Sequence, residues 1–103
     1  MTKYYLSVLK DNVSICLDSD IGYHHRFKIG DVIFVEYDIK SGSTLMFDGI
    51  SRHYSLTSGP EFVLDWHKTV SARLSIAGCI TKGIMVDITK QVDRDFKLKQ
   101  LGI

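Results

Sequence analysis

Residues 27–44, FKIGDVIFVEYDIKSGST, carry the clearest structural signal in the chain. The pair Gly30-Asp31 is typical of a turn, and the residues after it are mostly β-branched or aromatic, which favours a strand. A second turn, over residues 40–43, sends the chain back. The stretch therefore predicts one long strand and the beginning of its antiparallel partner.

Apolar residues occupy both faces of the strand predicted over residues 27–37. One face holds Ile33 and Val35, and the opposite face holds Val32 and Phe34. A strand that is apolar on both sides is either central in a sheet or curled so that each face is covered in turn. Strong curling is what the closure of a small barrel requires.

Apolar and polar residues alternate with period two on both sides of this stretch, which predicts further strands. Before it, residues 3–10 and 13–17 are predicted to pair as a hairpin through the turn dipeptide Asp11-Asn12. After it, Asp48-Gly49 favours a hairpin turn of the primed type. The later strands are predicted over residues 43–47, 50–57, 70–77 and 84–88, with residues 61–66 as an extension of the sheet.

The tail over residues 89–101 differs in kind from the rest of the chain. It is rich in Lys, Gln, Asp and Arg, and Ile88, Val92 and Phe96 are four residues apart, the spacing of one helix face. Gly102 stands where a helix C-cap is expected. The sequence thus predicts a mainly β fold: a small antiparallel β-barrel or curled sheet of six to seven strands over about residues 3–88, with one short C-terminal α-helix at about 89–101.

Length and composition indicate one folded domain over residues 1–103. Apolar residues make up 45% of the chain, enough for a single modest core, and the formal net charge is +1. No apolar run reaches the roughly 20 residues that span a bilayer, and the first residues lack the pattern of a signal peptide. We therefore predict a soluble cytoplasmic protein without membrane contact, in which Cys16 and Cys79 stay reduced.

The opening stretch resembles small Src-homology-3-like barrels, in which Phe-Lys-x-Gly-Asp precedes a strand that curls across the barrel. Residues 30–38 with Gly42-Ser43 are similar, more narrowly, to the segment that opens MazF/PemK-type toxins, which are ribonucleases with a related barrel. Here two predicted strands precede the segment, and Ile39 stands where that family has a proline. The motif that carries the family's catalytic arginine has no counterpart, so no catalytic residue is carried over.

Aromatic and basic residues gather just before the predicted central strand. Such a mixture can stack bases while its cations meet phosphates, or it can anchor a protein partner. The commonest alternative is that the tyrosines are half-buried strand residues without a partner. Adjacent histidines on a strand point to opposite faces, so no shared metal ion is predicted, and no cofactor. The candidate binding residues are Tyr23, His24, His25, Arg26, Lys28, Arg52, Tyr54 and Trp66.

These features favour three candidate functions, which we rank. The first is a non-enzymatic interaction module that binds and modulates or inhibits a partner protein, in the style of the accessory proteins that phages and mobile elements direct at host enzymes or defence systems. Neutral charge and the lack of a catalytic motif in the sequence favour it. The second is a barrel that binds single-stranded nucleic acid, and the third is a MazF-like ribonuclease. Association of copies through exposed strand edges is a further expectation.

Overall fold

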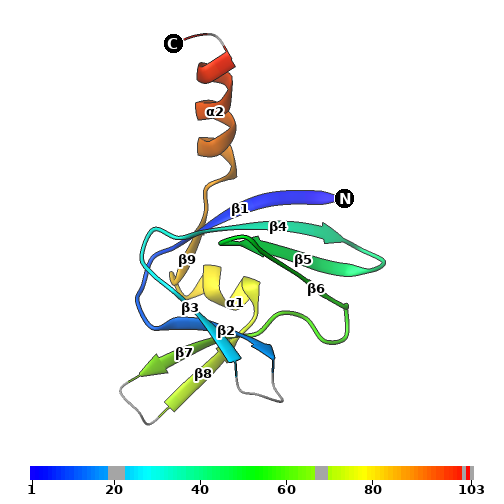
Figure 1. Cartoon of the computed structure of the whole chain (residues 1–103), viewed down its shortest axis with the longest axis vertical. Coiled ribbons are helices and arrows are strands. Elements are labelled where there is room, and N and C mark those ends of the chain that lie inside the picture. Colours follow the sequence, from blue (N-terminus) through cyan, green and yellow to red (C-terminus); the bar gives the residue numbers. More distant parts are fainter. Residues whose placement is uncertain (19–22, 67–69, 101, 103) are drawn as a thin grey trace.

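Two antiparallel sheets form the body of the protein in a computed structural model, which describes residues 1–18, 23–66, 70–100 and 102 (Figure 1). The elements are β1 (Thr2–Val8), β2 (Val13–Asp18), β3 (Tyr23–Phe27), β4 (Val32–Asp38), β5 (Gly42–Phe47), β6 (Ile50–Tyr54), β7 (Phe62–Trp66), β8 (Val70–Leu74), α1 (Ile76–Thr81), β9 (Met85–Asp87) and α2 (Thr89–Gln100). The five-stranded sheet has the order β6-β5-β4-β1-β9, and the four-stranded sheet has the order β3-β2-β7-β8.

The core fills the space between the two sheets. Phe27 of the four-stranded sheet lies against Phe47 of the five-stranded sheet, with ring centroids 5.1 Å apart. Burial of these apolar side chains is the main favourable term in folding. The buried apolar residues are Leu6, Val8, Val13, Ile15, Phe27, Ile33, Val35, Leu45, Phe47, Phe62, Leu64, Cys79, Ile84 and Met85.

The central place predicted for the strand after Gly30-Asp31 is confirmed. β4 pairs with β1 on one side and with β5 on the other. The strand begins at Val32 and not at Phe27, because residues 28–31 form a tight turn between the two sheets. In that turn the Asp31 amide donates to the Lys28 carbonyl over 3.0 Å, and the Lys28 amide donates to Asp31 Oδ2 over 2.8 Å.

The mainly β prediction and the C-terminal helix are confirmed, while strand number and closure differ from the prediction. The described residues form nine strands, and the two sheets are not closed into a barrel. β1 and β2 do not form the predicted hairpin, because β4 and β9 occupy both edges of β1 and the chain crosses to the other sheet after Val8. The predicted primed turn is present: Asp48 and Gly49 both have positive φ, 47° and 74°.

One helix was not predicted. The strand expected over residues 70–77 ends at Leu74, and the Ser75 hydroxyl caps α1 by accepting from the Gly78 amide over 3.2 Å. α1 has only six residues, too few for a helical period to stand out in the sequence. The predicted C-terminal helix is present as α2, and the Gly102 amide donates to the Lys99 carbonyl just past its end.

The molecule is elongated because α2 projects from the body (Figure 1). Its principal extents are 49 × 33 × 25 Å. The radius of gyration of the Cα atoms is 14.6 Å, whereas a compact chain of this length has about 13 Å. In the part of the chain that the structure describes, no helix has the length and apolar content needed to cross a membrane.

Candidate functional site

The predicted binding residues on β3 point to opposite sides of the strand. His25 pairs with Ile15 and is half-buried, whereas His24 and Arg26 are exposed on the other face. The two histidines are therefore separated by the strand, as the alternation of side chains requires. Tyr23 opens β3, and its side chain lies outside the described part of the structure.

A pocket of 370 Å³ opens between the sheets beside β3, and we call it the intersheet pocket. Aromatic rings form its floor: the centroid of the His25 imidazole lies 4.9 Å from that of Phe27 and 4.9 Å from that of Phe47. The two phenylalanines are only 2% and 5% exposed. The residues that line the pocket are His25, Arg26, Phe27, Lys28, Asp31, Val32, Phe47 and Asp48.

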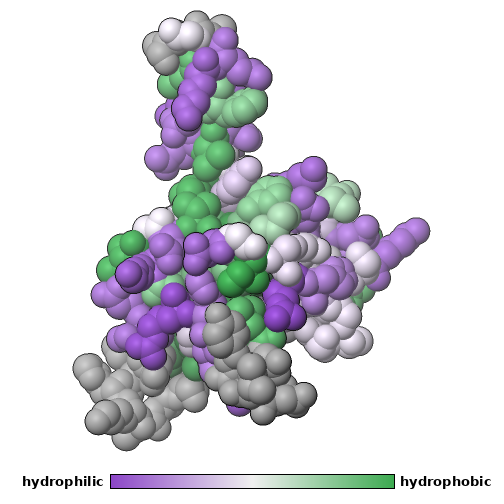
Figure 2. All heavy atoms as spheres, viewed as in Figure 1, coloured by the Kyte–Doolittle hydropathy of each residue, from purple (hydrophilic) through white to green (hydrophobic). Residues whose placement is uncertain are grey.

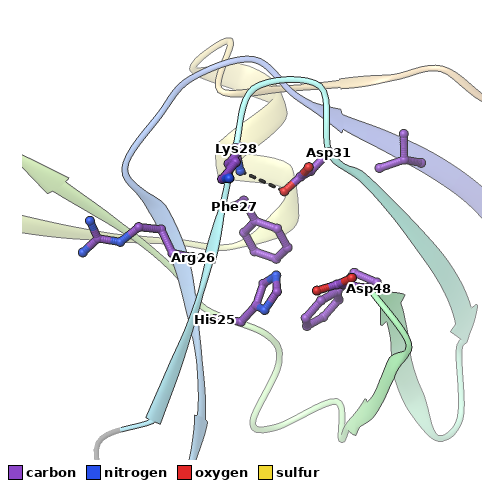
Figure 3. Close-up of a pocket in the computed structure, with 8 residues that line it drawn as sticks. His25, Arg26, Phe27, Lys28, Asp31 and Asp48 are labelled. Carbon is purple, nitrogen blue, oxygen red and sulfur yellow. Dashed lines mark hydrogen bonds between the residues drawn. The ribbon is translucent and has the colours of Figure 1, made fainter.

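Charges of both signs surround the intersheet pocket. Figure 3 shows Arg26 directed away from the space that His25, Asp31 and Asp48 enclose. Asp31 is engaged by the backbone amide of Lys28. Because the two phenylalanine rings are buried, they offer no open platform for stacking a base, and the two carboxylates oppose the approach of a phosphate. Several predicted binding residues therefore line the pocket, but its mixed charges do not favour the binding of an anion.

The predicted residues on β6 lie apart from those on β3. Arg52 pairs with Leu45 and Tyr54 with Ser43, which places both on the sheet face that looks toward the core. Burial raises the pKa of the Tyr54 phenol, and the nearby Arg52 guanidinium partly offsets this. Trp66 ends β7, and its side chain is outside the described residues. The structure therefore divides the predicted surface between two strands and two faces.

Neither the cysteines nor the acids form a further site in the part of the chain that the structure describes. Cys16 and Cys79 are both free thiols, the first half-buried and the second buried. Among the described residues, no group of three or more His, Cys, Asp or Glu side chains could hold a metal ion.

An apolar surface that sequence reasoning missed lies on the outer face of the five-stranded sheet, the face turned away from the core. Phe34 lies between Tyr5 on β1 and Met46 on β5 in the strand register. Next to this row, Val32 and Val86 both pair with Ser7. We call these five apolar residues, Tyr5, Val32, Phe34, Met46 and Val86, the outer patch.

The outer patch remains accessible to solvent. Val32 is 45% exposed and Val86 is 40% exposed, while Tyr5, Phe34 and Met46 are half-buried among one another. The rings of Tyr5 and Phe34 are in contact, with centroids 4.8 Å apart. The alternation in residues 32–37 gave a partial signal for this surface, but Met46 and Val86 join it only through the strand register.

The helix α2 stands on the same side of the five-stranded sheet (Figure 1). It has 12 residues, none of them buried, and Phe96 is 61% exposed. Figure 2 shows hydrophobic surface at the base of α2 and on the adjoining part of the body. The outer patch and α2 thus present apolar side chains in one region of the molecule.

Comparison of the chain with protein-family models, with curated proteins and with solved structures gave no match. We therefore infer function from the geometry of three features: the intersheet pocket, the outer patch and α2. Of these, the outer patch is an accessible apolar surface whose residues strand pairing holds in register.

Proposed function

We propose that this chain is a non-enzymatic interaction module that binds another protein through the outer patch. The observation that carries the proposal is the row of Tyr5, Phe34 and Met46 on three paired strands, with Val32 and Val86 on either side of Ser7 next to it. Single exposed apolar residues are ordinary, whereas a contiguous apolar patch on a soluble protein marks an interaction site.

The total accessible surface area of the chain is larger than that expected of a compact monomer. The chain exposes 7220 Å². A compact monomer of 11.7 kDa exposes about 5,900 Å², so the excess is roughly 1,300 Å². A standard protein interface buries about 800 Å² on each partner. The excess is as large as one side of such an interface, and the projecting helix α2 contributes to it (Figure 1).

The residue types favour a protein as the partner. Tyr, Phe and Met are enriched in the centres of protein interfaces, and charged residues are depleted there. The row next to the patch is polar, with Lys3 opposite Glu36 on the neighbouring strand, and can serve as a rim. A partner with an apolar, weakly charged surface fits this arrangement. That it is a host enzyme or defence protein stays a prediction of the sequence.

The proposal is tested by capture with matched variants. Tagged wild-type protein, Phe34→Ser and Ile39→Ser are incubated with lysate of the host cell, and bound material is identified by mass spectrometry. Phe34 is in the centre of the outer patch, whereas Ile39 is an exposed apolar residue in the turn after β4. We expect a partner that wild type and Ile39→Ser retain and that Phe34→Ser loses.

Thermal unfolding of Phe34→Ser provides the folding control, because the ring also contacts Tyr5. Where that variant is unfolded, Val86→Ser replaces it, since Val86 is at the accessible edge of the patch. Partners that bind the folded patch variants as well as wild type would contradict the proposal. Nucleic acid as the only retained material would contradict it too.

A further inference from the structure

Resting on the proposed function, we infer that one occupant of the outer patch is α2 of a second copy of this chain. The two copies exchange their C-terminal helices about a two-fold axis, so that each helix covers the outer patch of the other copy. Such a contact is closed and self-complementary, as in most homo-oligomers.

The first step is that α2 requires a contact that the single copy does not give it. The helix has 12 residues, and none of them is buried. Isolated helices shorter than about 12–15 residues are marginal in water, and most helices in proteins are stabilised by packing an apolar face. α2 carries such a face, since Val92 and Phe96 are one helical turn apart and Phe96 is largely exposed.

The second step is that the beginning of α2 is fixed to β1. The Tyr5 amide donates to Thr89 Oγ1 over 3.0 Å, and the Ile88 amide donates to the Tyr5 carbonyl over 2.9 Å. The Thr89 amide in turn donates to Asp87 Oδ1 over 2.9 Å. These bonds fix the base of α2 to β1, and from there the helix projects away from the body (Figure 1). In this arrangement α2 does not cover the patch of its own chain, so the cover that we infer comes from another molecule.

The third step is that the helix face and the patch match in size. The stripe from Ile88 through Val92 to Phe96 is about 12 Å long at 1.5 Å per residue. The row of Tyr5, Phe34 and Met46 crosses three strands, about 10 Å at the usual strand spacing. A helix laid on a sheet is also the usual way to bury an apolar sheet face.

Charge and symmetry favour a second copy as the occupant. The formal charge of +1 gives two copies little mutual repulsion. Each copy supplies both a helix and a patch, so one two-fold dimer covers both exposed helices and both outer patches. Three basic side chains of α2, Lys90, Arg94 and Lys97, lie on the sides away from Phe96 and stay in water in this arrangement. The fourth, Lys99, is three residues after Phe96, at the C-terminal end of the apolar stripe.

The mass of the full-length protein is measured by light scattering and by analytical ultracentrifugation over a wide range of concentration. We expect a dimer that dissociates on dilution. Phe96→Ser and Phe34→Ser should each weaken dimerisation at least about tenfold. Leu98→Ser is the matched control, because Leu98 is an exposed apolar residue on the side of α2 opposite Phe96. It should leave the dimer unchanged.

A mixing experiment separates helix exchange from other dimers. In a dimer of Phe34→Ser, both helix–sheet contacts contain a damaged patch, and in a dimer of Phe96→Ser both contain a damaged helix. A mixed dimer pairs one intact helix with one intact patch. Mixing the two folded variants should therefore give stronger association than either variant shows alone, because one contact of the mixed dimer is intact. Val86→Ser takes the place of Phe34→Ser if that variant does not fold.

Each other result overturns the exchange. A dimer sensitive to Phe96→Ser alone is a pair of helices, and one sensitive to Phe34→Ser alone is a pair of sheet faces. A dimer indifferent to both variants forms through another surface, such as the strand edges that the sequence predicts. A monomer at every concentration ends the inference but leaves the proposed function standing if Phe34-dependent capture of another protein persists. Loss of that capture as well would end both.

Discussion

At the scale of single residues, Val35 shows how the central strand contributes to stability. Its side chain is fully buried in β4, between the strands β1 and β5. Val35→Ala removes two methyl groups from the core and leaves a cavity that the paired backbone cannot close. We expect the free energy of unfolding to fall by roughly 1–3 kcal/mol, measured by urea denaturation.

The control for this measurement is Val32→Ala on the same strand. Val32 is exposed on the outer face, so its truncation leaves no cavity and should change the free energy of unfolding by less than about 0.5 kcal/mol. Equal losses in the free energy of unfolding would show that the core does not lie on the face of β4 that carries Val35.

Cys79 gives the stability a dependence on pH. Burial raises the pKa of its thiol from 9.0 to about 11. The folded state therefore keeps its proton at pH values where the unfolded state has lost it, and stability falls wherever the folded state binds more protons. We expect the contribution of this thiol to the free energy of unfolding to be unchanged below pH 9 and to decrease between pH 9 and pH 11, in urea titrations at several pH values.

Cys79→Ala isolates the contribution of the thiol. The variant should lose part of this decrease and keep the part that comes from Tyr4 and Tyr54, whose pKa values burial also raises above 10.0. An identical pH dependence in wild type and variant would mean that the Cys79 thiol ionises as easily in the folded protein as in the unfolded one.

At the scale of elements, the β4–β5–β6 segment depends on Gly42. This residue has a φ of +113°, and a Cβ atom added to it would lie 2.0 Å from the carbonyl oxygen of Tyr54 on the neighbouring strand. Gly42→Ala therefore combines backbone strain with a clash against paired backbone that cannot move freely. We expect it to lower the free energy of unfolding by at least about 2 kcal/mol, measured by thermal or urea unfolding.

Gly59→Ala is the matched substitution in the loop before β7. A Cβ atom there meets nothing within 4 Å, and the residue has no positive φ. Its effect should stay within about 0.5 kcal/mol. A small effect of both substitutions would mean that β6 can shift away from Gly42, and that the edge of the five-stranded sheet is loosely held.

Elements that local patterns specify were predictable, and those that tertiary pairing specifies were not. The strand after Gly30-Asp31, the Asp48-Gly49 turn and α2 each follow from periodicity or turn chemistry within a few residues. The hairpin expected from residues 3–17 failed because two distant segments, β4 and β9, compete for the edges of β1. The hydrophobic period and the turn residues do not specify which strands pair with each other.

At the scale of the whole molecule, the same limit applies to the candidate site. Clustering along the chain placed residues 23–28 together, but alternation along β3 turned His25 inward and Arg26 outward. The outer patch draws Tyr5, Phe34, Met46 and Val86 from four strands, and only their register makes them neighbours. A site assembled by sheet pairing is thus harder to predict from sequence than the strands that carry it.

The balance of charge over the molecule leads to a prediction about nucleic acids. The chain has 13 Lys and Arg residues against 12 Asp and Glu residues, and affinity for nucleic acid depends largely on neutralising phosphates with a basic surface. Arg26 and Arg52 point to different faces of different sheets, so these two cations do not combine into one groove. We expect no binding of fluorescently labelled single-stranded RNA at low salt, and no cleavage of that RNA.

Fluorescence anisotropy and gel electrophoresis of the same samples report the two outcomes, with a basic single-strand-binding protein as the positive control. A rise in anisotropy that added salt abolishes would contradict the expectation. If Arg26→Ser and Lys28→Ser then reduce the binding, the surface around β3 is the nucleic-acid site. Binding that instead survives both substitutions but is lost with Arg94→Ser would place the contact on the basic side of α2, where it would compete with a protein partner for the same helix.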